Sequence, residues 1–102
     1  MNWVYVASTG DILPGSARIF RKQDGKEISI FHLTDGRVLA LRNRCPHKGG
    51  PLSEGIVSNH YVFCPLHDWK INLEDGQVQA PDTGCVKTFP VKVEGGKIFV
   101  AC

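Results

Sequence analysis

The sequence lacks any long hydrophobic run. No apolar stretch approaches the roughly 18 residues that a membrane-spanning helix needs. The opening segment Met1–Val6 also lacks the basic start and extended apolar stretch of a secretory signal. We therefore expect a cytoplasmic protein that does not contact a membrane.

Charge of one sign is also scarce. Twelve Lys and Arg against ten Asp and Glu give a formal net charge of +2, and the basic residues are scattered along the chain. Nucleic-acid binding needs a concentrated positive surface, so no nucleic-acid partner is expected. The Gly-x-Gly-x-x-Gly pattern of Rossmann folds is absent as well, which excludes nicotinamide binding in that manner.

Sustained helical periodicity, internal repeats and linkers are missing too, which leaves short strands as the predicted elements. The 102 residues suffice for a modest core, so we expect a single domain covering residues 1–102. The expected strands cover residues 3–7, 17–21, 26–33, 37–41, 61–63, 77–79, 86–94 and 97–101. Asp35-Gly36 and Gly95-Gly96 fall between consecutive strands, where such dipeptides favour hairpin turns. The prediction is an all-β fold of antiparallel strands.

Only four cysteines are present, and the neighbours of two of them are the most informative feature of the chain. Cys45-Pro46-His47 and Cys64-Pro65-Leu66-His67 each offer one thiolate and one imidazole, with sixteen residues between His47 and Cys64. Zinc fingers normally group their ligands as a cysteine pair followed by a histidine pair. Mixed pairs instead suit a centre that treats two metal ions differently, such as an iron–sulfur cluster with cysteines on one iron and histidines on the other.

The remaining cysteines and histidines have no ligand-like neighbours. Four cysteines allow three disulfide pairings, but the two mixed motifs leave only Cys85 and Cys102 for a disulfide. We expect both to be free thiols, as in a reducing compartment. His32 and His60 are interpreted as ordinary surface or core histidines.

The two mixed motifs resemble those of the Rieske [2Fe–2S] family. The matching boxes are Cys-x-His-x-Gly-Gly-Pro-Leu at Cys45–Leu52 and Cys-Pro-Leu-His-Asp-Trp at Cys64–Trp69. The resemblance implies the Rieske fold, an antiparallel β-sandwich framework with an inserted cluster-binding lobe at about residues 44–81.

The same resemblance implies one [2Fe–2S] cluster per chain and a role in electron transfer. Cys45 and Cys64 would hold the buried iron, and His47 and His67 would hold the outer iron through Nδ1. A structural zinc site made by the same four side chains is the alternative.

The implied ligand set bears on the reduction potential. With neutral imidazoles the oxidised centre has a formal charge of about zero, against about −2 for four thiolates, so mixed ligation eases the addition of an electron. High-potential members of the family add a disulfide between the boxes and hydroxyl donors to the cluster. The matching positions here are Gly50 and Leu66 for the disulfide, and Trp69 and Ile71 for the hydroxyls. We therefore predict a low-potential, ferredoxin-like protein, suited to accepting electrons from nicotinamide by way of a flavin.

Several residues beside the boxes have interpretable roles. Gly49-Gly50-Pro51 can hold the first box rigid and bring backbone amides close to the cluster. Trp69 is interpreted as a lid that packs near the cluster. Four cations lie near the boxes and are candidates for a basic collar that docks an acidic redox partner, with solvated charges as the alternative. They are Arg42, Arg44, Lys48 and Lys70.

Finer features are similar to the small subunit of NAD(P)H-dependent assimilatory nitrite reductase. They lie at Cys45–Gly55, Cys64–Trp69 and Asp82–Val91; dioxygenase ferredoxins more often carry glycine where this chain has Asp68. The resemblance implies a large partner subunit that carries flavin, a further iron–sulfur cluster and sirohaem and reduces nitrite to ammonium in nitrate assimilation. This chain offers no open catalytic metal position, so we expect an electron-transfer subunit that is not catalytic alone.

Two other functions remain open at this point. One is the ferredoxin component of an aromatic-ring-hydroxylating dioxygenase system. The other is a non-redox module whose metal is structural.

Overall fold

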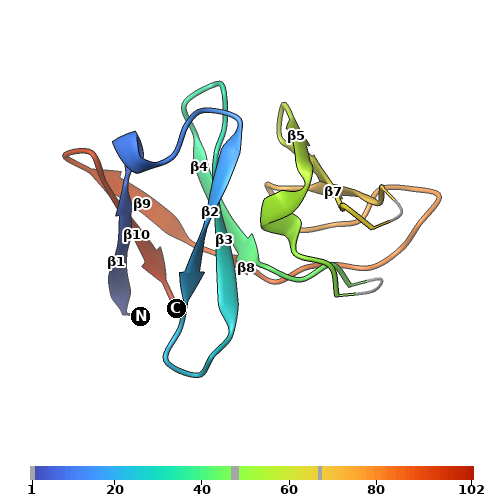
Figure 1. Ribbon diagram of the computed structural model, residues 1–102, viewed down its shortest axis with the longest axis horizontal. Coiled ribbons are helices and arrows are strands. Elements are labelled where there is room, and N and C mark those ends of the chain that lie inside the picture. Colours follow the sequence, from blue (N-terminus) through green and yellow to red (C-terminus); the bar gives the residue numbers. More distant parts are fainter. Residues whose placement is uncertain (1, 47–48, 67) are drawn as a thin grey trace.

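The computed structural model describes residues 2–46, 49–66 and 68–102, which form three antiparallel sheets (Figure 1). The strand orders are β1-β10-β9, β2-β3-β4-β8 and β5-β6-β7. The elements are β1 (Trp3–Ser8), the 3-10 helix η1 (Thr9–Asp11), β2 (Ser16–Arg21), β3 (Glu27–His32), β4 (Val38–Arg42), the 3-10 helix η2 (Leu52–Glu54), β5 (Ile56–Ser58), β6 (Tyr61–Phe63), β7 (Lys70–Asn72), β8 (Thr88–Phe89), β9 (Val91–Glu94) and β10 (Lys97–Ala101). The predicted all-β, antiparallel fold is confirmed. Within the described ranges, no helix has the length and apolarity to cross a membrane.

The four-stranded sheet is the central layer of the molecule, because its strands β3 and β4 are buried on both faces. Ile28 and Ile30 of β3 point into a core shared with β1 and β10, whereas Phe31 belongs to a second core shared with the β5-β6-β7 sheet. Successive strand residues point to opposite faces, so a strand covered on both sides needs a nearly continuous apolar run. Figure 1 shows the arrangement, with the β1-β10-β9 sheet on one side of the central sheet and β5 and β7 on the other.

The first two sheets form the sandwich framework, and the third sheet forms the inserted lobe. The framework core is apolar throughout and consists of Ala7, Ile12, Ile28, Ile30, Val38, Ala40, Ile98 and Val100. The lobe core contains Leu52, Val62, Ile71 and Leu73 together with Cys45 and Cys64. The two cysteines that are predicted to be ligands therefore pack in the core of the lobe.

The predicted hairpin turns form where the dipeptides indicate them. Gly36 has φ +95° between β3 and β4, and Gly95 and Gly96 have φ +57° and +76° between β9 and β10. Gly76 follows Asp75 with φ +75°, and a Cβ at this position would collide with the carbonyl oxygen of Val86. Glycine is required there for space as well as for conformation.

Two predicted strands differ from the structure: one is divided and the other does not form. The expected strand 86–94 is divided at Pro90 into β8 and β9, which belong to different sheets. Proline lacks the N–H that a continuous ladder would need, so the chain changes sheet at that residue. Residues 77–79 form only isolated bridges, Ile71 to Val78 and Gln77 to Cys85, and not a strand.

Candidate metal centre

We call the two boxes that carry the predicted ligands, Cys45–Leu52 and Cys64–Trp69, the first and second ligand boxes, and their loops the ligand loops. The second ligand box is the loop of the β6–β7 hairpin. The N–H of Cys64 donates to the Trp69 carbonyl at 2.8 Å, and the N–H of Asp68 donates to the Cys64 carbonyl at 3.1 Å. The strands pair in register up to this loop, with Phe63 opposite Lys70. Cys64 is therefore held at the end of a hydrogen-bonded hairpin, and it is fully buried.

The first ligand box follows β4 as a tight loop that also closes on its cysteine. The N–H of Cys45 donates to the Gly50 carbonyl, and the N–H of Gly49 donates to the Cys45 carbonyl, both at 2.8 Å. Gly49 has φ +72°, and a Cβ there would lie 3.3 Å from the Arg44 guanidinium. These contacts support the prediction that the Gly49-Gly50 pair shapes this loop.

The two loops meet at Gly50. A Cβ at this residue would lie 3.4 Å from Cys64 Sγ and 3.0 Å from Leu66 Cδ1. Gly50 therefore lets the first loop approach Cys64 and Leu66 of the second loop more closely than a residue with a side chain would. The contact also agrees with the expectation that Gly50 and Leu66 occupy facing positions of the two boxes.

The structure brings the two predicted cysteine ligands together in one buried site. Cys45 and Cys64 are both free of disulfides and lie in the same core, with 1% and 0% of their surfaces exposed. Burial, aided by the neighbouring Cys45 thiol, raises the pKa of Cys64 to about 11. Binding of a metal there must displace the thiol proton, because the thiolate is the ligand. A close pair of buried, unbridged cysteines fits the donor chemistry of an iron–sulfur or zinc centre.

The two predicted histidine ligands, His47 and His67, lie outside the described residues, as does Lys48. Among the residues that are described, no three His, Cys, Asp or Glu side chains gather as a metal site. The geometry at hand is therefore that of the cysteine half, and the histidine half remains a prediction.

The other two histidines have structural contacts, as expected. His32 Nδ1 lies 2.7 Å from the Ile12 carbonyl oxygen, between β3 and the segment after η1. His60 Nε2 lies 3.8 Å from Glu74 Oε1, and its ring lies 4.2 Å from that of Tyr61. Both histidines therefore contribute to packing between segments of the fold.

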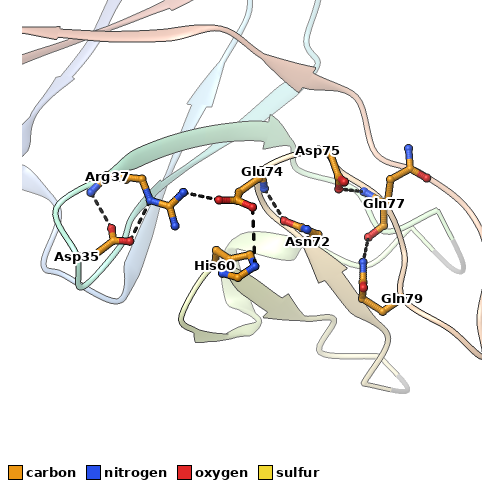
Figure 2. Close-up of polar contacts among 8 residues, drawn as sticks. All are labelled: Asp35, Arg37, His60, Asn72, Glu74, Asp75, Gln77 and Gln79. Atoms are coloured by element: carbon orange, nitrogen blue, oxygen red, sulfur yellow. Dashed lines mark hydrogen bonds and ion pairs between the residues drawn. The ribbon is translucent and has the colours of Figure 1, made fainter.

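A polar network supports the side of the lobe that faces the β3–β4 turn (Figure 2). Arg37 of that turn binds Asp35 at 2.9 Å and also binds Glu74 in the loop after β7. The Glu74 N–H donates to Asn72 Oδ1 at 2.8 Å, which shapes the loop. The hydrogen bond from the Arg37 guanidinium to the Glu74 carboxylate lowers the pKa of Glu74. The network ties the framework to the lobe.

Asn43 is a supporting residue that motif reasoning did not identify. Its Oδ1 accepts a hydrogen bond from the Ser53 N–H at 2.8 Å, and its Nδ2 donates to Glu27 Oε1 at 3.2 Å. Asn43 is nearly buried and lies two residues before Cys45. An asparagine between a strand and a ligand box gives no sequence signal for this role, because its partners come from β3 and η2.

The neighbours of the boxes are an aromatic residue that packs against the core and several cations. Trp69 is half-buried against the core that contains both cysteines, in agreement with its interpretation as a lid. Lys70 Nζ lies 4.2 Å from the centre of the Tyr61 ring, in a cation–π contact. Arg42 and Arg44 line a pocket with Lys87, a cation that the expected collar did not include.

Comparison with known proteins gives consistent matches over most of the chain. A family model described as the Rieske [2Fe-2S] domain matches residues 2–90. The 3-phenylpropionate/cinnamic acid dioxygenase ferredoxin subunit of Escherichia coli is 34% identical over 102 residues, covering 98% of this chain and 93% of the relative.

Two solved structures are also similar. One is the ferredoxin of carbazole 1,9a-dioxygenase from Nocardioides aromaticivorans, with a TM-score of 0.88, 29% identity and coverage of 99% of this chain and 98% of that chain. The other is described as an NADH-dependent nitrite reductase small subunit from Mycobacterium tuberculosis, with a TM-score of 0.87, 28% identity and coverage of 97% and 93%.

Proposed function

We propose that this chain, which belongs to the Rieske [2Fe–2S] domain family, is the electron-transfer small subunit of an NAD(P)H-dependent nitrite reductase. As a Rieske protein it carries a [2Fe–2S] cluster, which supplies one-electron transfer. Its partner would be a large subunit with flavin, a further iron–sulfur cluster and sirohaem. The whole chain, residues 1–102, would act as one domain, with the lobe at about 44–81 holding the cluster.

The proposed ligands are Cys45 and Cys64 on one iron and His47 and His67 on the other. The buried contact between the two cysteine loops supports the first pair. The second pair follows from the spacing of the boxes, each of which places its histidine within three residues of its cysteine. The chain would hold the cluster and pass electrons, while the chemistry on nitrite would take place in the large subunit.

Asp68 is the observation that carries the choice of nitrite reductase. It follows the second box histidine and has φ +54°, a left-handed conformation that glycine adopts without strain. Dioxygenase ferredoxins more often have glycine at this position, whereas Cys-Pro-Leu-His-Asp-Trp is similar to the nitrite reductase subunit. An aspartate at a position where glycine would fit more easily supports the likeness to the nitrite reductase subunit.

The second candidate is a ferredoxin component of a ring-hydroxylating dioxygenase. The 34% identity to the Escherichia coli dioxygenase ferredoxin subunit favours it, since the similarity extends over 98% of this chain. Both candidates share one-electron transfer and differ in the protein that receives or supplies the electron.

Reconstitution with each partner tests the proposal. The cluster-loaded chain is combined with a tagged sirohaem-containing large subunit of a nitrite reductase, NADH or NADPH, and nitrite. We expect the two proteins to co-purify and nitrite-dependent oxidation of the nicotinamide to depend on this chain, with ammonium as product. Electron delivery to a dioxygenase oxygenase, without binding to the sirohaem subunit, would contradict the proposal and favour the second candidate.

A further inference from the structure

A basic pocket of about 240 Å³ lies beside the first ligand loop. Arg42, Arg44 and Lys87 provide its charged lining, and segments 45–46 and 85–86 form the rest of the wall. The pocket therefore connects the end of β4, the first ligand box and the segment that leads into β8. We use the name basic pocket for this site.

Backbone pairing and side-chain contacts place the three cations around this pocket. The N–H of Arg42 donates to the Lys87 carbonyl at 2.9 Å, which continues the β4–β8 pairing by one residue. The Arg44 guanidinium lies over Gly49 in the first ligand loop. Lys87 Nζ lies 5.3 Å from the centre of the Phe89 ring. Two sequence-distant segments thus bring their cations to the same place.

The positive charge of the basic pocket is not neutralised within the described part of the chain. No carboxylate lines the pocket, and no ion pair there involves its three cations. Other cations are paired, for example Arg21 with Glu27 and Arg37 with Asp35. The three cations repel one another in this small pocket. An anion that enters is attracted to all three and offsets their repulsion.

The position of the basic pocket beside the first ligand loop indicates where a bound anion would come from. Cys45, a proposed cluster ligand, forms part of its wall, so a group bound there lies against the first ligand loop. We propose that the basic pocket receives carboxylate side chains from an acidic patch on the protein that exchanges electrons with this chain. This inference rests on the proposed electron-transfer function and names the chemistry of the partner surface.

Charge reversal with a matched control tests the inference. The pocket variant is Arg42→Glu/Arg44→Glu/Lys87→Glu. The control, Arg18→Glu/Lys26→Glu/Lys97→Glu, changes the net charge equally at exposed framework cations. Visible absorbance of the cluster and thermal melting establish that both variants fold. A milder variant, Arg42→Gln/Arg44→Gln/Lys87→Gln, serves if the reversal prevents folding.

Two readouts are compared at low and high salt. The first is the association rate of each variant with the large nitrite reductase subunit and, in parallel, with a dioxygenase oxygenase. The second is oxidation of the reduced protein by ferricyanide, in which one electron passes from the protein and ferrocyanide is formed. We expect the pocket reversal to slow both processes roughly tenfold or more at low salt relative to the control, with the difference shrinking at high salt.

Equal rates for the pocket and control variants would overturn the inference. If neither protein partner binds even the unmodified chain, the proposed function fails, while the ferricyanide comparison still decides whether the basic pocket attracts anions to the centre. If instead the pocket reversal abolishes self-association in sedimentation experiments, the occupant is a second copy of this chain and the assignment to a redox partner is wrong.

Discussion

Cys45 and Cys64 are almost inaccessible to solvent and lie side by side without a disulfide. Free cysteines are often buried as small apolar side chains. A pair on two closed loops, in a core against which Trp69 packs, fits a site that holds metal through thiolates. Cys85, by contrast, is exposed and belongs to no such loop pair.

This contrast gives the first prediction. Cys64→Ala removes a proposed ligand and should abolish the visible absorbance of the cluster, whereas Cys85→Ala should retain it in full. Absorbance spectra and iron content of the two purified variants provide the measurement. Retention of iron by Cys64→Ala would exclude Cys64 as a ligand.

Residues at four other positions bear on the reduction potential of the cluster. Gly50 and Leu66 cannot form a disulfide between the loops, and Trp69 and Ile71 cannot donate O–H hydrogen bonds to sulfur. Because fewer hydrogen bonds stabilise the reduced state, we predict a potential near the lower end of the Rieske range, about −150 mV. Redox titration monitored by EPR measures it. A value of about +200 mV or higher would contradict this reasoning.

At the scale of elements, Asn43 connects three segments that position the first ligand loop. Its side chain bonds to Glu27 of β3 and to the backbone of Ser53 in η2, while its own N–H donates to the Glu27 carbonyl at 2.9 Å. A nearly buried amide with partners on both sides holds the strand end and the 3-10 turn together.

Asn43→Ala should lower the free energy of unfolding by about 1–3 kcal/mol, because it leaves the Ser53 N–H without its acceptor. Denaturant unfolding of the cluster-loaded protein measures this. Asn2→Ala, at an exposed position, is the control and should change stability by less than about 0.5 kcal/mol. Equal stabilities of the two variants would show that the Asn43 bonds contribute little.

The elements also show what the sequence could predict. Hairpins with local signals, such as Asp35-Gly36 between β3 and β4, were predicted with boundaries correct to within one residue on each adjoining strand end. Short β5 and β7 were not predicted, because three residues carry too little alternation to be recognised. Pro90 marks a change of sheet within residues 86–94, whose alternation of apolar and polar residues indicates one continuous strand.

The candidate site was predictable to a similar degree. Cys45 and Cys64 were predicted from motif spacing and lie together, while His47 and His67 remain predictions. The position of Lys87 beside Arg42 and Arg44 was not predictable, because it depends on the pairing of β8 with β4.

For the whole molecule, the central sheet lies between two cores. At the surface, Arg37 connects the framework with the lobe. Its contacts with Asp35 and Glu74 connect the β3–β4 turn with the loop after β7 (Figure 2). The hydrogen bond from Arg37 lowers the pKa of Glu74 from its ordinary 4.5, and the backbone N–H of Arg37 lowers that of Asp35 from 3.8. Lowered carboxyl pKa values stabilise the fold above the unfolded-state values, and this stabilisation is lost as pH falls through the folded-state values.

Arg37→Ala removes the guanidinium that binds Glu74 and Asp35 and keeps the backbone N–H. It should therefore reduce the melting temperature at pH 7 and have a progressively smaller effect as pH falls below about 4. Melting of the variant and the unmodified protein across this range measures the difference. Lys97→Ala, at an exposed cation in the first position of β10, is the control. A deficit of equal size at pH 7 and at pH 3 would indicate that the ion pairs are not its cause.

The most direct test of the whole account is the chemical identity of the centre. Iron and acid-labile sulfide are assayed in the purified chain, and pulsed EPR of the reduced protein detects nitrogen nuclei coupled to the unpaired electron. We predict two irons and two sulfides per chain and coupling from two imidazole nitrogens. One zinc ion per chain without labile sulfide, or an iron–sulfur signal without nitrogen coupling, would contradict a centre shared by two cysteines and two histidines.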